Sequence, residues 1–215
     1  MNNKDLFTIL ALIPQGLILS GILIGLLRLR KLGAVQRLLV LMFIITGLVE
    51  VGSEVLWQNG VNNYALFHIY ALLEFSILIL IYRQTFQRQL TRKVLKAAIF
   101  VFVAFGIINA LFFQSVFEPN TNVITTSSVL LVALSISFLF RVLSDMRYDR
   151  LEKSAMFWID IGVLVYFSSS FALFNFGEEL VPYSIESTIN VWTLHIFFNV
   201  LHYIAFCIAL WMKPE

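Results

Sequence analysis

The chain has little charge. Lys, Arg, Asp and Glu make up 13% of its 215 residues, about half of the roughly 25% found in soluble domains. Apolar residue types make up 60%, and a fold of this size could not cover itself with a polar surface. This balance excludes an ordinary soluble enzyme, a disordered chain and a nucleic-acid-binding domain. It indicates a protein whose solvent is mostly lipid.

Several chemical signatures are also missing. Cys207 is the only cysteine, which excludes an intrachain disulfide. The chain has no Gly-x-Ser-x-Gly, P-loop, Cys-x-x-Cys or His-Glu-x-x-His motif, each of which would indicate a known chemistry. The last apolar segment holds no lysine to which retinal could attach. We therefore expect binding rather than catalysis, although the sequence does not decide whether the chain is an enzyme.

The sequence does contain seven apolar segments, each long enough to cross the roughly 30 Å hydrocarbon layer as a helix rising about 1.5 Å per residue. A membrane barrel would need alternating segments of about ten residues, and none occur. We predict an all-α, seven-transmembrane-helix bundle forming a single domain over residues 1–215. The predicted helices are residues 6–27, 38–57, 64–81, 97–117, 123–140, 155–176 and 191–212.

Basic residues gather in alternate connections between these segments. All but Lys4 of the 15 Lys and Arg residues lie in the first, third and fifth connections or in the C-terminal tail. The second connection is uncharged, the fourth holds only Glu118, and the sixth holds Glu178, Glu179 and Glu186 with no base. The positive-inside rule therefore predicts that the N-terminus lies outside the membrane and the C-terminus inside.

Seven ionisable residues fall inside the predicted helices, where charge is costly and indicates function. They are Glu50, Glu54, His68, Glu74, Asp160, His195 and His202. Their spacing places several of them on shared helix faces. Glu50 and Glu54 are four residues apart, as are Tyr70 and Glu74. Trp192, His195, Asn199 and His202 are separated by three, four and three residues.

The depth of these residues predicts an outward-opening polar pocket. Counted from the predicted helix ends, one group lies in the outer half of the bundle, and His202 and Asp160 continue it inward. The prediction requires that the second, third, sixth and seventh helices adjoin. The predicted outer group is Glu50, Glu54, His68, Glu74, His195 and Asn199.

Three functions could use this pocket. The first is the binding of a small ligand or cation by a sensory module, because histidine titrates near neutral pH. The second is metal-dependent hydrolysis of a lipid, with His68, His195 and Glu50 as candidate zinc ligands. The third is proton-coupled transport of a small solute. A purely structural role as hydrogen bonds between helices is the remaining interpretation.

Two membrane protein families share part of this pattern. The layout is similar to that of ceramidase-type and progestin-receptor-like hydrolases, but their His-x-x-x-His pair in the last helix is absent, since His195 and His202 are seven residues apart. Pro14-Gln15 resembles the proline-glutamine pair of PQ-loop transporters. A second such pair is missing from residues 123–140.

A third resemblance covers most of the chain. The segment from Phe157 to Ser168, together with the face of Trp192, His195 and Asn199, resembles small bacterial seven-helix membrane proteins of unassigned function. Those look like the membrane-sensor half of sensor kinases. The resemblance implies a sensory or accessory role in a bacterial inner (plasma) membrane, with a cytoplasmic partner at the basic inner loops. The lipid bilayer is the other expected partner, and nucleic acid is not one.

Small residues predict close helix packing in the first segment. Gly21 and Gly25 form a Gly-x-x-x-Gly pair, which allows two helix backbones to approach each other. We predict that this pair packs against another helix of the same bundle rather than against a second copy of the chain.

Overall fold

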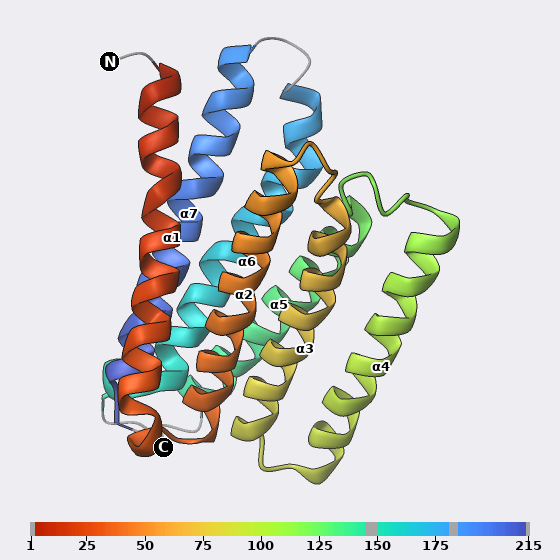
Figure 1. Ribbon diagram of the computed structural model, residues 1–215. Coiled ribbons are helices and arrows are strands. Elements are labelled where there is room, and N and C mark those ends of the chain that lie inside the picture. The colour runs from red at the N-terminus through yellow and green to blue at the C-terminus, as the bar shows by residue number, and fades with distance from the viewer. Residues whose placement is uncertain (1–2, 145–149, 181–184, 214–215) are drawn as a thin grey trace.

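The chain folds into long helices that run up and down side by side (Figure 1). The structure is a computed structural model that describes residues 3–144, 150–180 and 185–213. The helices are α1 (Asn3–Arg28), α2 (Ala34–Gln58), α3 (Tyr64–Thr85), α4 (Gln89–Phe112), α5 (Thr121–Ser144), α6 (Ala155–Leu180) and α7 (Ile185–Trp211), with short 3-10 turns at η1 (Leu29–Lys31) and η2 (Leu151–Lys153). The predicted all-α class and the seven apolar helices are confirmed.

Each of the seven helices contains a stretch that is long and apolar enough to cross a membrane, judged by length and composition. Helices suit such a solvent because every backbone N–H and C=O inside the segment finds its partner in the same segment. The sequence of apolar runs is therefore sufficient to predict the helices.

The predicted boundaries of the fourth helix were wrong. The prediction was 97–117, whereas α4 runs from Gln89 to Phe112. Its first two turns contain charged residues, which the search for apolar residues left out. At its other end, Phe113 and Gln114 both donate their backbone N–H to the carbonyl of Asn109. The chain then turns away although the residues remain apolar.

The predicted pocket requires that the second, third, sixth and seventh helices adjoin, and the structure contains these contacts. α2 packs against α3, and it also touches α6 and α7, while α6 and α7 pack along each other. α5 contacts both α3 and α6, and α1 lies against α2 and α7. α4 packs mainly on α3 and stands at one side of the bundle (Figure 1). The second, third, sixth and seventh helices therefore adjoin, with α5 as an additional neighbour.

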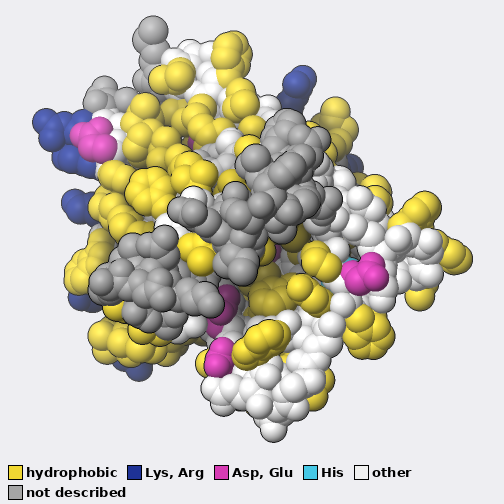
Figure 2. Space-filling model, turned by 90° about the horizontal axis from the view of Figure 1, so that it is seen from above, with side chains coloured by type: hydrophobic (Ala, Val, Ile, Leu, Met, Phe, Trp, Pro, Cys, Tyr) yellow, Lys and Arg dark blue, Asp and Glu magenta, His cyan; other side chains and the backbone are white. Residues whose placement is uncertain are grey.

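The two ends of the bundle differ in charge. At the basic end, α1, α3, α5 and α7 finish and α2, α4 and α6 begin. Described basic side chains from Arg28 to Lys213 lie in these connections. The opposite, acidic end carries Glu54 and Glu118. Figure 2 looks onto this acidic end and shows Lys and Arg side chains only near the outline of the molecule.

The densest packing lies toward the basic end. Phe43 of α2 and Leu78 of α3 are essentially inaccessible there. Ile159 of α6 and Leu210 of α7 are 0% exposed. Other large apolar or aromatic side chains that are fully buried in this half are Leu39, Met42, Phe75, Ile81, Tyr82, Met156 and Phe206. This packed half holds the helices in place and leaves the half nearer the acidic end to form the site.

α1 approaches α2 closely because it presents glycines there. A Cβ atom at Gly21 would lie 2.5 Å from Cε1 of Phe43, and one at Gly25 would overlap a methyl group of Val40. A Cβ atom at Gly16 would have nothing within 4 Å. The predicted packing of the glycine pair inside the bundle is therefore confirmed.

We predict that Gly21→Ala and Gly25→Ala each lower the melting temperature of the purified protein by several degrees. Overpacking costs about 1–3 kcal/mol, and one kcal/mol corresponds to about 2–4 °C in a chain of this size. Gly16→Ala is the matched control and should leave the melting temperature the same or higher. Equal melting of all three variants would contradict this account of the contact between α1 and α2.

Candidate functional site

A cavity of about 550 Å³ lies in the half of the bundle nearer the acidic end. Its walls come from α2, α3, α5, α6 and α7 and from the connection between α4 and α5. The volume is within the range of about 300–1,000 Å³ typical of small-molecule sites. Most of the surface that the lining presents is apolar. The polar or amphipathic lining residues are Thr46, Glu50, Tyr64, Tyr70, Glu74, Asn120, Thr121, Ser127, Ser128, Tyr166, Ser170, Trp192, His195, Asn199 and Tyr203.

Three side chains on α2 and α3 form a hydrogen-bonded row in the cavity wall. The hydroxyl of Tyr70 donates to Oε1 of Glu74 at 2.9 Å. The hydroxyls of Thr46 and Tyr70 lie 3.0 Å apart, and Thr46 Oγ1 lies 2.9 Å from the carbonyl oxygen of Met42. Since the proton of Tyr70 goes to Glu74, the single proton of Thr46 is given either to Tyr70 or to Met42. Tyr70 and Glu74 can join in this way because they are one helical turn apart. The row orients the carboxylate of Glu74 at the cavity.

Glu50 also lines the cavity, whereas Glu54 does not. Glu50 is half-buried. Glu54 lies one turn nearer the helix end and is exposed, and its Oε1 accepts a hydrogen bond from Nε2 of Gln58 at 2.8 Å. The two residues lie on one helix face, as predicted, but only Glu50 lies at the cavity, because Glu54 is one turn closer to the exposed helix end.

His195 and Asn199 of α7 line the cavity, as their spacing predicted. The ring of His195 lies 5.7 Å from that of Tyr166 and 5.8 Å from those of Phe174 and Trp192, between centroids. Together these four rings form an aromatic wall contributed by α6 and α7. Aromatic side chains of this kind combine an apolar face with a polar edge.

Four polar atoms of the cavity-lining residues have no hydrogen-bond partner within the described part of the chain. They are Nδ1 of His195, Oδ1 of Asn199, Oγ of Ser128 and Oγ of Ser170. Ser128 is 0% exposed and Ser170 is 2% exposed. An unsatisfied buried polar group costs about 1–3 kcal/mol, and such groups are rare in native structures. Five further buried atoms of the described residues lack a partner away from this cavity, on Arg28, Arg83, Arg92, Asp160 and His202. The four atoms named first are distinguished by lining one common space.

The predicted inward continuation of the pocket is not part of this cavity, because His202 does not line it. His202 is 1% exposed, and its Nδ1 donates to the carbonyl of Gly162 at 2.9 Å. Its ring packs 3.9 Å from that of Phe206 and 4.7 Å from that of Tyr166. His202 thus packs behind the cavity wall, and its Nε2 has no hydrogen-bond partner among the described residues.

Asp160 lies deeper, in the packed half, and does not line the cavity either. It is 0% exposed, and its Oδ1 accepts a hydrogen bond from the hydroxyl of Tyr82 at 2.5 Å. Ser135 donates to the backbone carbonyl of Asp160 at 3.4 Å. The bond to Tyr82 ties α6 to α3 at the basic end.

His68 also lies away from the cavity lining. Its Nε2 donates to the carbonyl of Glu118 at 3.0 Å and so holds the connection between α4 and α5. The predicted metal candidates His68, His195 and Glu50 are therefore not brought together. No group of three or more His, Cys, Asp or Glu side chains that could hold a metal ion occurs among the described residues.

Sequence reasoning placed Tyr70 on a face with Glu74 and predicted Asn199 in the pocket, but it missed other neutral residues of the site. Tyr166 and Tyr203 line the cavity, as do Ser128 and Ser170. A search for ionisable residues passes over these side chains. A usable signal was available, because tyrosines and paired serines in the middle of apolar helices also need partners in lipid.

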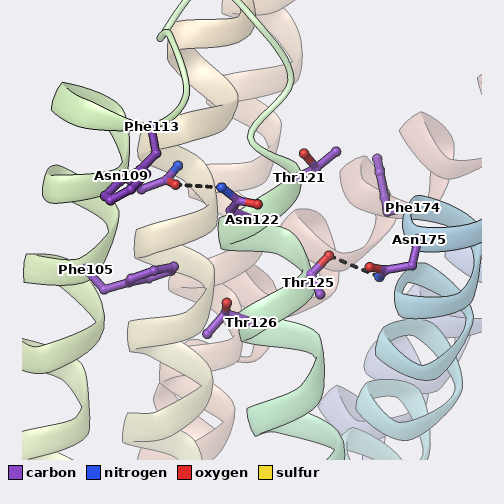
Figure 3. A pocket seen from close by; sticks show the side chains of 9 residues that line it. All are labelled: Phe105, Asn109, Phe113, Thr121, Asn122, Thr125, Thr126, Phe174 and Asn175. Atoms are coloured by element: carbon purple, nitrogen blue, oxygen red, sulfur yellow. Dashed lines mark hydrogen bonds between the residues drawn. The ribbon is translucent and has the colours of Figure 1, made fainter. Parts of the chain in front are cut away.

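A second cavity of about 460 Å³ lies between α4, α5 and α6. Its amide groups mainly satisfy one another. Figure 3 shows Asn122 directed toward Asn109, to which it donates at 2.9 Å, and Asn175 directed toward Thr125 at 3.1 Å. Asn109 in turn donates to Gln114 at 3.0 Å. This network closes the helix ends and has less need of a ligand than the cavity described above.

Comparisons with protein-family models, with curated proteins and with solved structures found nothing that matches this chain. A function therefore has to be inferred from the residues and charges of the cavity.

We predict that Tyr70→Phe lowers the melting temperature by several degrees. The substitution removes the donor to Glu74 and the hydroxyl beside Thr46, and leaving a buried group without its partner costs about 1–3 kcal/mol. Tyr64→Phe is the control, since Tyr64 is 39% exposed at the start of the same helix. If both variants melt like the unmodified protein, the row does not contribute to stability.

Proposed function

We propose that the chain is a receptor-like membrane module that binds a small solute from outside in the cavity between α2, α3, α5, α6 and α7. The four unpartnered polar atoms among the described cavity-lining residues carry this proposal. A solute, with any water that accompanies it, would complete their hydrogen bonds.

The charge of the two ends supports an orientation in the membrane. Basic loops stay on the cytoplasmic side, so the basic end faces the cytoplasm and the acidic end faces outward. The N-terminus is then outside and the C-terminus inside, in a bacterial inner (plasma) membrane. The cavity lining includes Tyr64, Pro119 and Asn120, which lie in or beside the connections at the acidic end. The cavity would therefore open to the outside.

The packing below the cavity favours binding over transport. Side chains that are at most 1% exposed lie between the cavity and the basic end; they include Phe43, Leu78, Ile159 and Leu210. A pocket that ends on a packed core holds a solute without passing it on. The separation of His68 from His195 and Glu50 likewise favours binding over zinc-dependent hydrolysis.

A receptor-like role requires an output. In this proposal a separate cytoplasmic partner would supply it. Arg28, Arg37, Arg92 and Lys153 are among the basic side chains at the cytoplasmic end. They would attract an acidic surface of that partner as well as anionic lipid headgroups. The resemblance to the membrane part of sensor kinases supports the same division of labour.

Cysteine accessibility tests whether the cavity opens outward. In a Cys207→Ser background, Ser170→Cys places a thiol at the cavity, and Ser168→Cys places one two residues away on the exposed helix face. We predict that the membrane-impermeant reagent 2-(trimethylammonium)ethyl methanethiosulfonate labels Ser170→Cys in right-side-out vesicles and does not label Ser168→Cys, which would face lipid.

The same labelling in inverted vesicles tests whether the cavity can be reached from the cytoplasmic side. We expect Ser170→Cys to stay unlabelled there, because the packed half lies between it and the cytoplasm. Labelling from the cytoplasmic side alone would reverse the proposed orientation. Labelling from neither side would remove the outward-open pocket, and labelling from both sides would favour a transporter.

A further inference from the structure

We propose that the solute is an organic ammonium ion, a primary or secondary amine with an apolar body. This inference rests on the function proposed above and names the chemical class that the same cavity would take. It follows from the charge, the hydrogen-bonding groups and the aromatic side chains of the lining.

The charges of the lining have one sign. The carboxylates of Glu50 and Glu74 line the cavity from α2 and α3, and the described lining contains no Lys or Arg. At about 1.5 Å per residue, the two carboxylates lie about 12–15 Å from the helix ends at the acidic end. A buried charge is stable when it is paired, so two carboxylates without a basic neighbour in the lining favour a cationic occupant.

The surroundings of the cavity would concentrate cations. Glu54 and Glu118 are the described charged side chains at this end. A region of one charge sign raises the local concentration of the opposite ion and speeds its association.

The hydrogen-bonding groups favour a donor with N–H bonds. The carboxylates of Glu50 and Glu74 and Oδ1 of Asn199 can only accept hydrogen bonds from a cation. Asn199 Oδ1 has no partner among the described residues, and the buried hydroxyls of Ser128 and Ser170 can accept as well. An ammonium group supplies up to three N–H donors to such a set, whereas a metal ion would need a tighter group of ligands than the described residues form.

The rest of the lining suits an apolar body and a positive charge beside it. The aromatic wall of Tyr166, Phe174, Trp192 and His195 presents ring faces and edges at the cavity. A cation near a tryptophan or tyrosine face gains about 0.5–2 kcal/mol. Val49, Phe67, Ala71, Ile124, Phe167 and Leu173 supply the apolar surface. The cavity thus combines carboxylates from α2 and α3 with an aromatic wall from α6 and α7. An arylalkylammonium ion has the matching combination of a positive charge and an aromatic ring.

Three probes of nearly equal shape test this class. They are 2-phenylethylammonium, the neutral 2-phenylethanol and the anionic phenylacetate, titrated calorimetrically into the full-length protein in lipid nanodiscs. We predict that the ammonium ion binds at least tenfold more tightly than the alcohol and that phenylacetate binds more weakly still. Equal affinities, or no binding of the ammonium ion, would overturn the proposal.

Charge-removing variants locate the effect. Glu50→Gln and Glu74→Gln should each raise the Kd of the ammonium ion by at least tenfold and change the Kd of the alcohol by no more than about twofold. Glu54→Gln removes a carboxylate of α2 that lies outside the cavity, and it should change the Kd of either probe by no more than about twofold. An equal loss in Glu54→Gln would assign the effect to surface charge and contradict the site. An unchanged affinity for the alcohol shows that a variant has kept its fold.

The two proposals fail separately. If Ser170→Cys is labelled from outside and the alcohol binds as well as the ammonium ion, the cavity remains a binding site and the ammonium class is wrong. If Ser170→Cys is not labelled and no probe binds, the binding function itself is wrong.

Discussion

Lipid offers no hydrogen bonds, so every polar group inside a membrane bundle has to find its partner within the protein. The packed half of this bundle meets that requirement at several positions. Gln36 donates to the carbonyls of Ala209 and Met212 at 2.8 and 3.1 Å and accepts from the backbone of Gly33. The hydroxyl of Tyr82 donates to Asp160. Around the cavity, Ser128 and Ser170 are buried with hydroxyls that have no partner among the described residues. Asp160 Oδ2 and His202 Nε2 also lack a partner among the described residues. What distinguishes the atoms at the cavity is that His195, Asn199, Ser128 and Ser170 line one shared space.

The packed half also explains how a cavity can persist in an apolar bundle. Close contacts fix the helices on both sides of it, as Gly21 and Gly25 do between α1 and α2 and Gly162 does against Phe206 of α7. These contacts fix the positions of the helices, so the bundle does not depend on side chains near the acidic end filling the cavity. A preformed pocket of this kind loses less entropy when a solute binds than one that has to be ordered first.

Much of the fold could be predicted from the sequence, because apolar runs of membrane length leave the backbone no alternative to helices. The spacing of His195 and Asn199 correctly predicted a face that points into the bundle. Contacts between distant segments could not be predicted in this way. His68 bonds to a backbone carbonyl fifty residues away, which no side-chain pattern encodes, and one turn of helix separates Glu50 in the cavity from Glu54 outside it. The resemblance to sensor modules stays a prediction.

The central claim is that the cavity is a polar chamber whose hydrogen bonds are completed by something other than the protein. An experimental structure in lipid nanodiscs, at a resolution that shows ordered water, tests it most directly. The account predicts water or solute density within hydrogen-bond distance of His195 Nδ1, Asn199 Oδ1 and the hydroxyls of Ser128 and Ser170. Closure of α5, α6 and α7 on one another, so that these atoms bond to protein groups and the cavity disappears, would contradict it.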